Sequence, residues 1–138
     1  MQDRFKFRVW YTPWDETEQP EMLYNAESAY DYMGEVPSSS FGSVLEDKSF
    51  EVMQCTGLKD KNGKLIYEGD IIKCWREDKE IGKFLVLYKK SGYRFACNFP
   101  DDNGYYIAPL ADSLSFWEDD RLEIIGNIYE NPELLESN

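Results

Sequence analysis

The chain has 138 residues, which is enough for one domain of ordinary size with a sizeable core. Hydrophobic residues make up 42% of it and aromatic residues 16%, which argues against intrinsic disorder. The net charge is −12, and the chain contains no histidine. Ser-His and Cys-His nucleophile pairs are therefore excluded, and the usual general base at neutral pH is absent.

The chain also lacks the patterns of membrane-spanning, secreted and metal-binding proteins. Its longest apolar run is Phe84–Tyr88, whereas a membrane helix needs about 20 such residues. The first residues have no apolar signal-peptide core, so we expect a cytoplasmic protein with no membrane partner. Three cysteines without a C-x-x-C pair predict buried thiols rather than disulfides or a zinc site: Cys55, Cys74 and Cys97.

The N-terminal third predicts strands separated by irregular segments. Phe5, Phe7 and Val9 alternate with charged residues, which is typical of a half-buried strand that ends near Pro13. Three short apolar runs are expected to form further strands: Met22–Tyr24, Phe41–Leu45 and Phe50–Cys55.

The segment from Thr56 to Ile72 carries the clearest turn signals. Asn62-Gly63 predicts a type I′ hairpin, in which both central residues adopt positive φ. Three glycines are expected at positive φ: Gly57, Gly63 and Gly69. Asp70 is expected to cap the turn into Ile71. The alternative is that Asp70 or Glu68 is a catalytic carboxylate, but turn geometry accounts for the polar residues here.

Five later strands are predicted, with turn signals between them. Gly82–Tyr88 is apolar on both faces, which indicates a central strand. Asn131-Pro132-Glu133 predicts a short terminal helical turn with Asn131 as its cap. Short, closely spaced strands favour a barrel or a sandwich. The five predicted strands are Ile71–Trp75, Gly82–Tyr88, Tyr93–Phe99, Tyr105–Ala108 and Leu122–Ile125.

Paired carboxylates at Asp101-Asp102 and Glu118–Asp120 are expected to face solvent, because neighbouring acids in a strand or turn do not converge on one substrate. No P-loop or G-x-G-x-x-G motif is present. We therefore assign no catalytic, cofactor-binding or metal-binding residue and expect a protein that is not an enzyme.

Charge is unevenly distributed along the chain. Residues 61–98 carry a balance of +4, whereas residues 1–60 carry −7 and residues 99–138 carry −9. Cations mixed with aromatic rings are typical of small barrels that bind nucleic acid. The alternative, which the total charge favours, is that these cations are the outward residues of strands. The candidate contacts to nucleic acid or a partner are Lys73, Trp75, Arg76, Lys83, Lys89, Lys90 and Arg94.

The four tryptophans are candidate anchors for a partner, because interface hot spots are enriched in this residue. A core position is the alternative for each of them, and the sequence alone does not separate the two. They are Trp10, Trp14, Trp75 and Trp117.

Three stretches of the chain, Phe5–Trp10, Val52–Ile72 and Ile124–Leu135, resemble the YopX family of phages and prophages of Gram-positive bacteria. The resemblance extends from end to end but is looser over residues 12–50 and 76–120. It implies a mostly β fold, with some helix, of several coiled sheets that include a small SH3-like barrel. We expect one domain over residues 1–138, with an N-terminal β and loop region (1–55) and a barrel region (56–138).

The family supplies no activity, so function is inferred from what remains. Our leading hypothesis is a non-enzymatic phage or prophage accessory protein that binds a host or phage protein or forms a homo-oligomer. One alternative is nucleic-acid binding through the basic segment 61–98. Another is an acidic mimic of nucleic acid that occupies a basic host protein.

Overall fold

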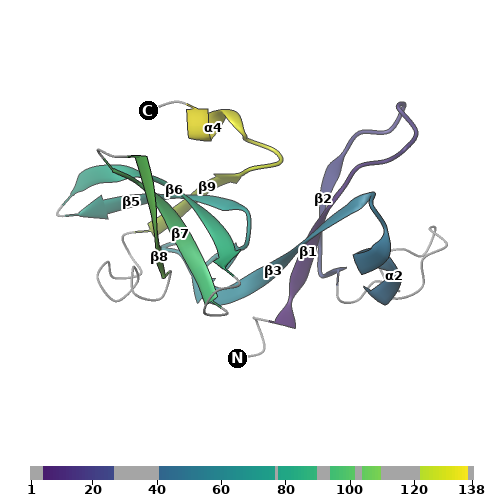
Figure 1. Cartoon of the computed structure of the whole chain (residues 1–138), viewed down its shortest axis with the longest axis horizontal. Coiled ribbons are helices and arrows are strands. Elements are labelled where there is room, and N and C mark those ends of the chain that lie inside the picture. The colour runs from purple at the N-terminus through teal and green to yellow at the C-terminus, as the bar shows by residue number, and fades with distance from the viewer. Residues whose placement is uncertain are drawn as a thin grey trace. The chain divides into compact units, whose positions relative to one another are not determined.

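The computed structural model describes residues 5–26, 41–76, 78–89, 94–101, 104–109 and 122–136. Nine strands and two short helices lie in these residues, so the predicted mostly β fold is confirmed (Figure 1). The chain divides into two compact units, Met1–Gly57 (unit 1) and Leu58–Asn138 (unit 2). The single-domain organisation over residues 1–138 stays a prediction.

Unit 1 contains an antiparallel ribbon of β1 (Phe7–Tyr11), β2 (Glu21–Tyr24) and the first part of β3 (Phe50–Lys59), with β1 in the middle. Val9 of β1 lies opposite Leu23 of β2 and Val52 of β3. The predicted inward face is confirmed for buried Val9 and partly buried Phe7, which pack in the same core, but not for Phe5, which precedes β1 and is exposed. The other core residues are Ala26, Phe50, Tyr11, Leu23 and Val52.

The opposite face of β1 is more buried than a half-buried strand requires. Arg8 is only 2% exposed, and its guanidinium carbon lies 5.9 Å from the centre of the Tyr24 ring. Met53, its partner on β3, is also buried. A weakly hydrated, planar guanidinium stacks on aromatic faces more readily than an ammonium does. The period-two pattern therefore identified the strand but not the burial of its charged face.

The segment expected to be a strand over Phe41–Leu45 is instead the helix α2 (Phe41–Glu46). This prediction was wrong because a short apolar run has no period of its own that separates strand from helix. By contrast, the strand predicted over Phe50–Cys55 is confirmed as the beginning of β3.

Unit 2 is built on a five-stranded antiparallel sheet in the order β8-β7-β6-β5-β9. Its third strand is β6, so the central position predicted for residues 82–88 is confirmed. Irregular pairing at Cys74/Trp75 and at Ile71/Ile72 bends β5, and the sheet curls into half a barrel (Figure 1). The strands are β5 (Asp70–Arg76), β6 (Lys79–Lys89), β7 (Arg94–Asp101), β8 (Gly104–Pro109) and β9 (Leu122–Asn127).

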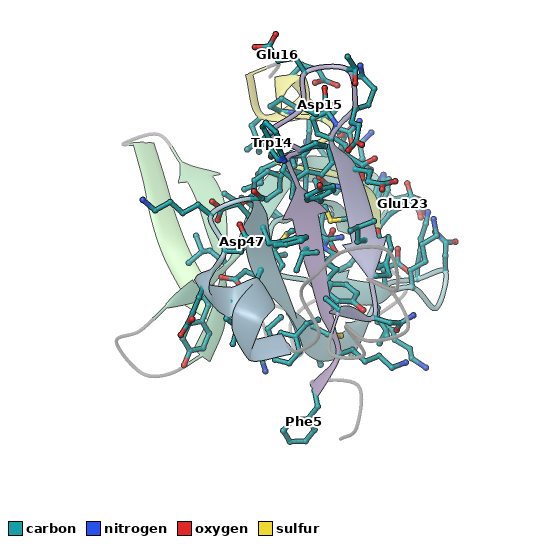
Figure 2. The ribbon with its side chains drawn as sticks, turned by 90° about the vertical axis from the view of Figure 1, so that its right-hand side faces the viewer. Phe5, Trp14, Asp15, Glu16, Asp47 and Glu123 are labelled. Carbon is teal, nitrogen blue, oxygen red and sulfur yellow. The ribbon has the colours of Figure 1, made fainter. Side chains whose placement is uncertain are left out.

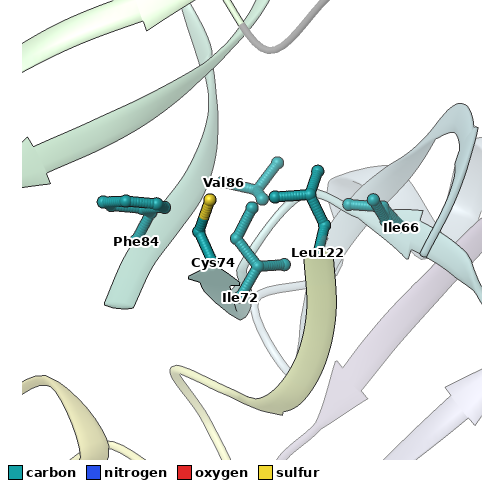
Figure 3. Close-up of a cluster of buried hydrophobic side chains, with 6 residues drawn as sticks. All are labelled: Ile66, Ile72, Cys74, Phe84, Val86 and Leu122. Carbon is teal, nitrogen blue, oxygen red and sulfur yellow. The ribbon is translucent and has the colours of Figure 1, made fainter. Parts of the chain in front are cut away.

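Inside the curl lies a compact apolar core, to which the short strand β4 (Leu65–Tyr67) contributes Ile66 (Figure 3). Each side chain of this core is at most 2% exposed, and Leu58 and Ile124 pack against it. Cys74 belongs to it, and both Cys74 and Cys55 are buried, as predicted. The six core residues are Ile66, Ile72, Cys74, Phe84, Val86 and Leu122.

Two absences hold for the part of the chain that the structure describes. It contains no cluster of three or more His, Cys, Asp or Glu residues placed to hold a metal ion. None of its helices combines the length and the apolar character needed to cross a membrane.

Candidate interaction site

Asp60 stabilises the hairpin that precedes β4. Its side chain is buried, and its Oδ1 accepts hydrogen bonds from the N–H groups of Asn62 and Lys64, both at 2.9 Å. Its Oδ2 accepts the N–H of Ile124 on β9 at 3.0 Å. One carboxylate therefore holds the loop closed and ties it to a strand 64 residues away in the sequence.

The same hairpin does not adopt the predicted type I′ turn. Gly63 has a φ of +79°, but Asn62 is not among the described residues with positive φ. The Gly63 N–H donates to the Asp60 carbonyl at 3.0 Å, and the Asp60 N–H donates to the Lys64 carbonyl at 2.9 Å. The Asp60 side chain thus selects a longer loop with one left-handed residue, and it overrides the Asn-Gly signal.

Asp70 has the turn role predicted for it. It is 1% exposed, and its Oδ2 accepts the N–H of Tyr67 at 2.7 Å across the turn that contains Gly69. Gly69 has a φ of +89°, as expected, and its carbonyl accepts the N–H of Ile128 at 3.0 Å. Asp70 therefore holds the backbone of the β4–β5 turn.

Asn127 organises the turn between β9 and the helix α4 (Glu133–Glu136). Its Oδ1 accepts the N–H groups of Tyr129 and Glu130 at 3.0 and 2.9 Å. The Asn131 side chain, which we expected to cap α4, accepts the N–H of Asn127 at 3.3 Å instead. It lies so close to Gly126 that a Cβ on that glycine would be 2.5 Å from its Oδ1. A glycine is thus required at position 126 for packing.

The outer face of β5 carries a compact group that we call the Trp75 cluster: Trp75, Lys61, Lys73, Glu80 and Glu123. The amines of Lys61 and Lys73 lie 4.5 and 5.8 Å from the centre of the Trp75 ring. Lys61 pairs with Glu123 at 3.2 Å, and Lys73 pairs with Glu80 at 3.1 Å. Both lysines therefore have a carboxylate beside them, and the cluster is close to electrically neutral.

The predicted contact residues are only partly brought together. Lys73 and Trp75 share the Trp75 cluster, and Lys83 lies opposite Lys73 on β6. The Lys83 amine donates to the carbonyl of Leu134 in α4 at 3.2 Å. For Arg76, Lys89 and Arg94 the structure describes only the backbone, and Lys90 lies outside the described residues, as does Trp117.

The most exposed aromatic side chain of the described residues lies in unit 1. Trp14 is 91% exposed in the loop that joins β1 to β2, where Asp15 and Glu16 are its neighbours (Figure 2). Trp10 and Trp75, in contrast, are half-buried. We call residues 12–20 the Trp14 tip. It presents a large apolar ring to solvent, which is the character of an interface anchor.

The Trp14 tip has a defined backbone. The Asp15 Oδ1 accepts hydrogen bonds from the N–H and the Oγ1 hydroxyl of Thr17 at 2.9 and 2.8 Å. The Glu18 N–H donates to the Asp15 carbonyl at 3.1 Å, and the Thr12 N–H donates to the Ser49 carbonyl at 2.8 Å. Hydrogen bonds from the Thr17 N–H and hydroxyl lower the pKa of Asp15, so its carboxylate is charged at neutral pH.

Comparison with known proteins assigns the family. The YopX protein model matches residues 6–136. The chain belongs to the YopX family. It is also similar to the crystal structure of protein EF1440 from Enterococcus faecalis, with 26% sequence identity and a TM-score of 0.51 over 94% of this chain and 96% of that one. No curated protein matches the chain.

The buried polar residues of the YopX-like stretches have a structural role. Asp60, Asp70 and Asn127 all lie in the stretches that resemble YopX, and each bonds backbone N–H groups in a turn. The parts of the YopX-like stretches that lie in unit 2 thus encode turns, whereas Phe5–Trp10 contributes the strand β1 of unit 1. The Trp14 tip lies in the loosely matching region, where the motif carries no information about it.

Two features of the site escaped the sequence analysis. Lys61, which lies nearest to the Trp75 ring, was not among the predicted contacts, because 14 residues separate the two and only the curl of the sheet brings them together. The Trp14 tip did carry a signal. Asp15 followed two residues later by Thr17 is the pattern of an aspartate turn, which implies an ordered loop around the tryptophan.

Proposed function

We propose that this protein is a non-enzymatic accessory protein of a phage or prophage and that it acts by binding another protein. The observation that carries this proposal is the 91% exposure of Trp14. A tryptophan buries about 150–250 Å² when it enters a core or an interface. While the Trp14 ring is exposed to water, the protein lacks the hydrophobic stabilisation that burial would give. Binding to a partner with a matching pocket would bury the ring and supply that stabilisation.

The absence of catalysis is part of the proposal, and the turn contacts support it. Asp60 and Asp70 each direct carboxylate oxygens at backbone N–H groups. A carboxylate used in this way stabilises a loop and is not held in reserve for a substrate. The phage or prophage setting is supported by the YopX family, whose resemblance led us to expect it.

Binding to nucleic acid through residues 61–98 is the weaker candidate. The cations beside Trp75 favour it, but Glu123 and Glu80 pair with the two lysines. Phosphates would have to displace both carboxylates, against a net charge of −12. For this reason we place the interaction with a protein first.

The test is capture from the bacterium whose genome carries the gene. The full chain, immobilised at one end, is incubated with nuclease-treated lysate, beside an unrelated bait of similar size and charge. We expect a protein that is retained in a fixed molar ratio to this chain. It should not be retained by the unrelated bait, and an excess of free chain should displace it. Size-exclusion chromatography shows whether that protein is a second copy. A monomeric chain that retains nothing would contradict the proposal.

A further inference from the structure

We infer that the Trp14 tip is the docking element of this protein and that it enters an apolar pocket rimmed by lysine or arginine side chains on a partner protein. The inference rests on the proposed function and makes it specific, because it states which surface binds and what chemistry receives it. Figure 2 labels three residues of the tip, Trp14, Asp15 and Glu16, in the β1–β2 connection.

The first argument is that the ring is both exposed and held on an ordered loop. Two bonds from Thr17 to the Asp15 carboxylate and one from Glu18 to the Asp15 carbonyl fix the backbone beside Trp14. The loop begins at Thr12, which is bonded to Ser49. An ordered loop loses less conformational entropy on binding than a flexible loop does.

The second argument is charge. Residues 12–21 contain no lysine or arginine but four acidic residues: Asp15, Glu16, Glu18 and Glu21. An exposed apolar side chain in an acidic segment is complementary to an apolar pocket rimmed by positive charge. The same carboxylates repel phosphate, so nucleic acid and anionic lipid surfaces are poor receptors for this tip.

Other surfaces of the described residues offer less. The ring of Trp75 is half-buried and has lysine amines over it, and their carboxylate partners lie beside them. Phe5 and Leu45 are less exposed, at 58% and 56%, and neither lies in an exclusively acidic segment, since Lys6 follows Phe5 and Lys48 lies three residues after Leu45. They are useful as matched controls because they are apolar, exposed and in the same unit as Trp14.

The first experiment maps the contact. A photo-reactive phenylalanine analogue replaces Trp14 in the full chain, and in separate proteins it replaces Phe5 or Leu45. After irradiation in the native bacterium, we expect an adduct from position 14 to a protein segment that contains apolar residues beside lysine or arginine. An adduct to nucleic acid or to an acidic segment would overturn the inference, and so would adducts from positions 5 and 45 alone.

The second experiment measures affinity with the captured protein as the probe. We expect Trp14→Ala to weaken binding at least about tenfold, as loss of a hot-spot tryptophan does, and Trp14→Phe to weaken it less. Leu45→Ala should leave the affinity unchanged. Equal binding by wild type and Trp14→Ala would overturn the docking inference while leaving the proposed function standing. Failure of the wild type to bind any protein would overturn both.

The third experiment isolates the charge of the tip together with Glu21, the first residue of β2. The triple variant Glu16→Gln, Glu18→Gln, Glu21→Gln is compared with Glu46→Gln, Glu51→Gln, Glu133→Gln, which changes the net charge equally at exposed positions elsewhere. We expect the tip triple to reduce the association rate at low ionic strength by about tenfold and the control triple to change it much less. If the two triple variants lower the association rate equally, the inference that lysine or arginine side chains rim the partner's pocket is wrong.

Discussion

Trp75 and Trp14 are both flanked by charged residues, but they occupy opposite situations. Two lysine amines lie over the Trp75 ring, and each lysine pairs with a glutamate. The Trp14 ring is 91% exposed, and its charged neighbour Asp15 bonds Thr17. At Trp75 the two lysines beside the ring are paired within the molecule, whereas the acidic loop around Trp14 leaves its aromatic ring exposed to solvent.

The same contrast separates the two units in the use of their carboxylates. In unit 2, Asp60 and Asp70 are buried and accept backbone hydrogen bonds. In unit 1, the acids of the Trp14 tip are exposed, and Asp15 is the one whose carboxylate accepts a turn hydrogen bond in the structure. Buried carboxylates thus hold turns of unit 2, whereas the carboxylates of the Trp14 tip in unit 1 face solvent, where we propose that a partner binds.

The largest expected difference in stability is between a variant of a core residue and a variant of the exposed Trp14. Phe84→Ala empties a core position that is 2% exposed and should cost about 3–5 kcal/mol of unfolding free energy. Trp14→Ala should change it by less than about 0.5 kcal/mol, because the ring contacts mainly water. Guanidinium unfolding followed by circular dichroism measures both. A Trp14→Ala chain as unstable as Phe84→Ala would show that the ring is structural.

Removal of Asp60 should have the next largest effect. Asp60→Ala leaves three backbone N–H groups without their acceptor and should cost about 2–4 kcal/mol. Asp15→Ala is the matched control, since it removes a similar aspartate turn from an exposed loop, and its effect should be clearly smaller. Denaturant midpoints of the two variants decide the order. Equal losses would mean that burial does not distinguish the two turns.

Gly126→Ala tests whether the β9 motif is a packing motif. The new Cβ would lie 2.5–2.9 Å from the atoms of the Asn131 side chain, so we expect a loss of about 1–3 kcal/mol. In an Asn131→Gly background the same change should cost less, because the obstructing atoms are gone. A double-mutant cycle on thermal unfolding measures the coupling. Additive losses would place the strain elsewhere.

Lys61→Ala probes the Trp75 cluster and should have a small effect. The ion pair with Glu123 is one-third exposed on both sides, and the amine lies over an aromatic ring, so we expect a loss below about 1 kcal/mol. The loss should shrink at high salt, where the ion pair is screened. Lys64→Ala in the same hairpin serves as the control for removing a lysine. An effect that grows with salt would contradict this reading.

The strands were predictable because their signals are local. Alternation identified β1, and an apolar run with both faces buried identified β6 as central. The helix α2 was missed because six residues are too few to show a helical period. The hairpin was misassigned because Asn62-Gly63 specifies a turn only when no neighbouring side chain competes, and Asp60 does compete.

The candidate site was harder to predict because exposure is a property of the folded chain. Trp14 was one of four tryptophans in the sequence, and the turn pattern of Asp15 and Thr17 beside it indicates an ordered loop but not how exposed the ring is. The predicted cationic contacts were chosen by composition, yet Lys73 proved to be paired with Glu80 through the register of β5 and β6. Long-range pairing decides which charges remain available, and a single sequence does not display it.

The smallest expected effect concerns the acidity of the Trp14 tip. Hydrogen bonds from the Thr17 N–H and, second, from its hydroxyl hold the Asp15 pKa below its usual value of 3.8. A lowered folded-state pKa means that the turn is stabilised above pH 3.8 and loses this stabilisation as the pH falls through the folded pKa. The Asp15 turn should therefore be unchanged from about pH 5 to 8.

Titration of the Asp15 carboxyl carbon by NMR measures this directly, with the Thr17 amide as the reporter of the turn. Thr17→Val removes the hydroxyl but keeps the N–H, so the Asp15 pKa should rise toward its usual value without reaching it, since the backbone bond is the larger cause. A midpoint at or above 3.8 in the wild type, or a Thr17 amide that shifts near neutral pH, would show that the loop beside Trp14 is not held as the structure has it. The tip would then have to become ordered on binding. It would lose conformational entropy in doing so, which removes one of the reasons for inferring that it is the docking element.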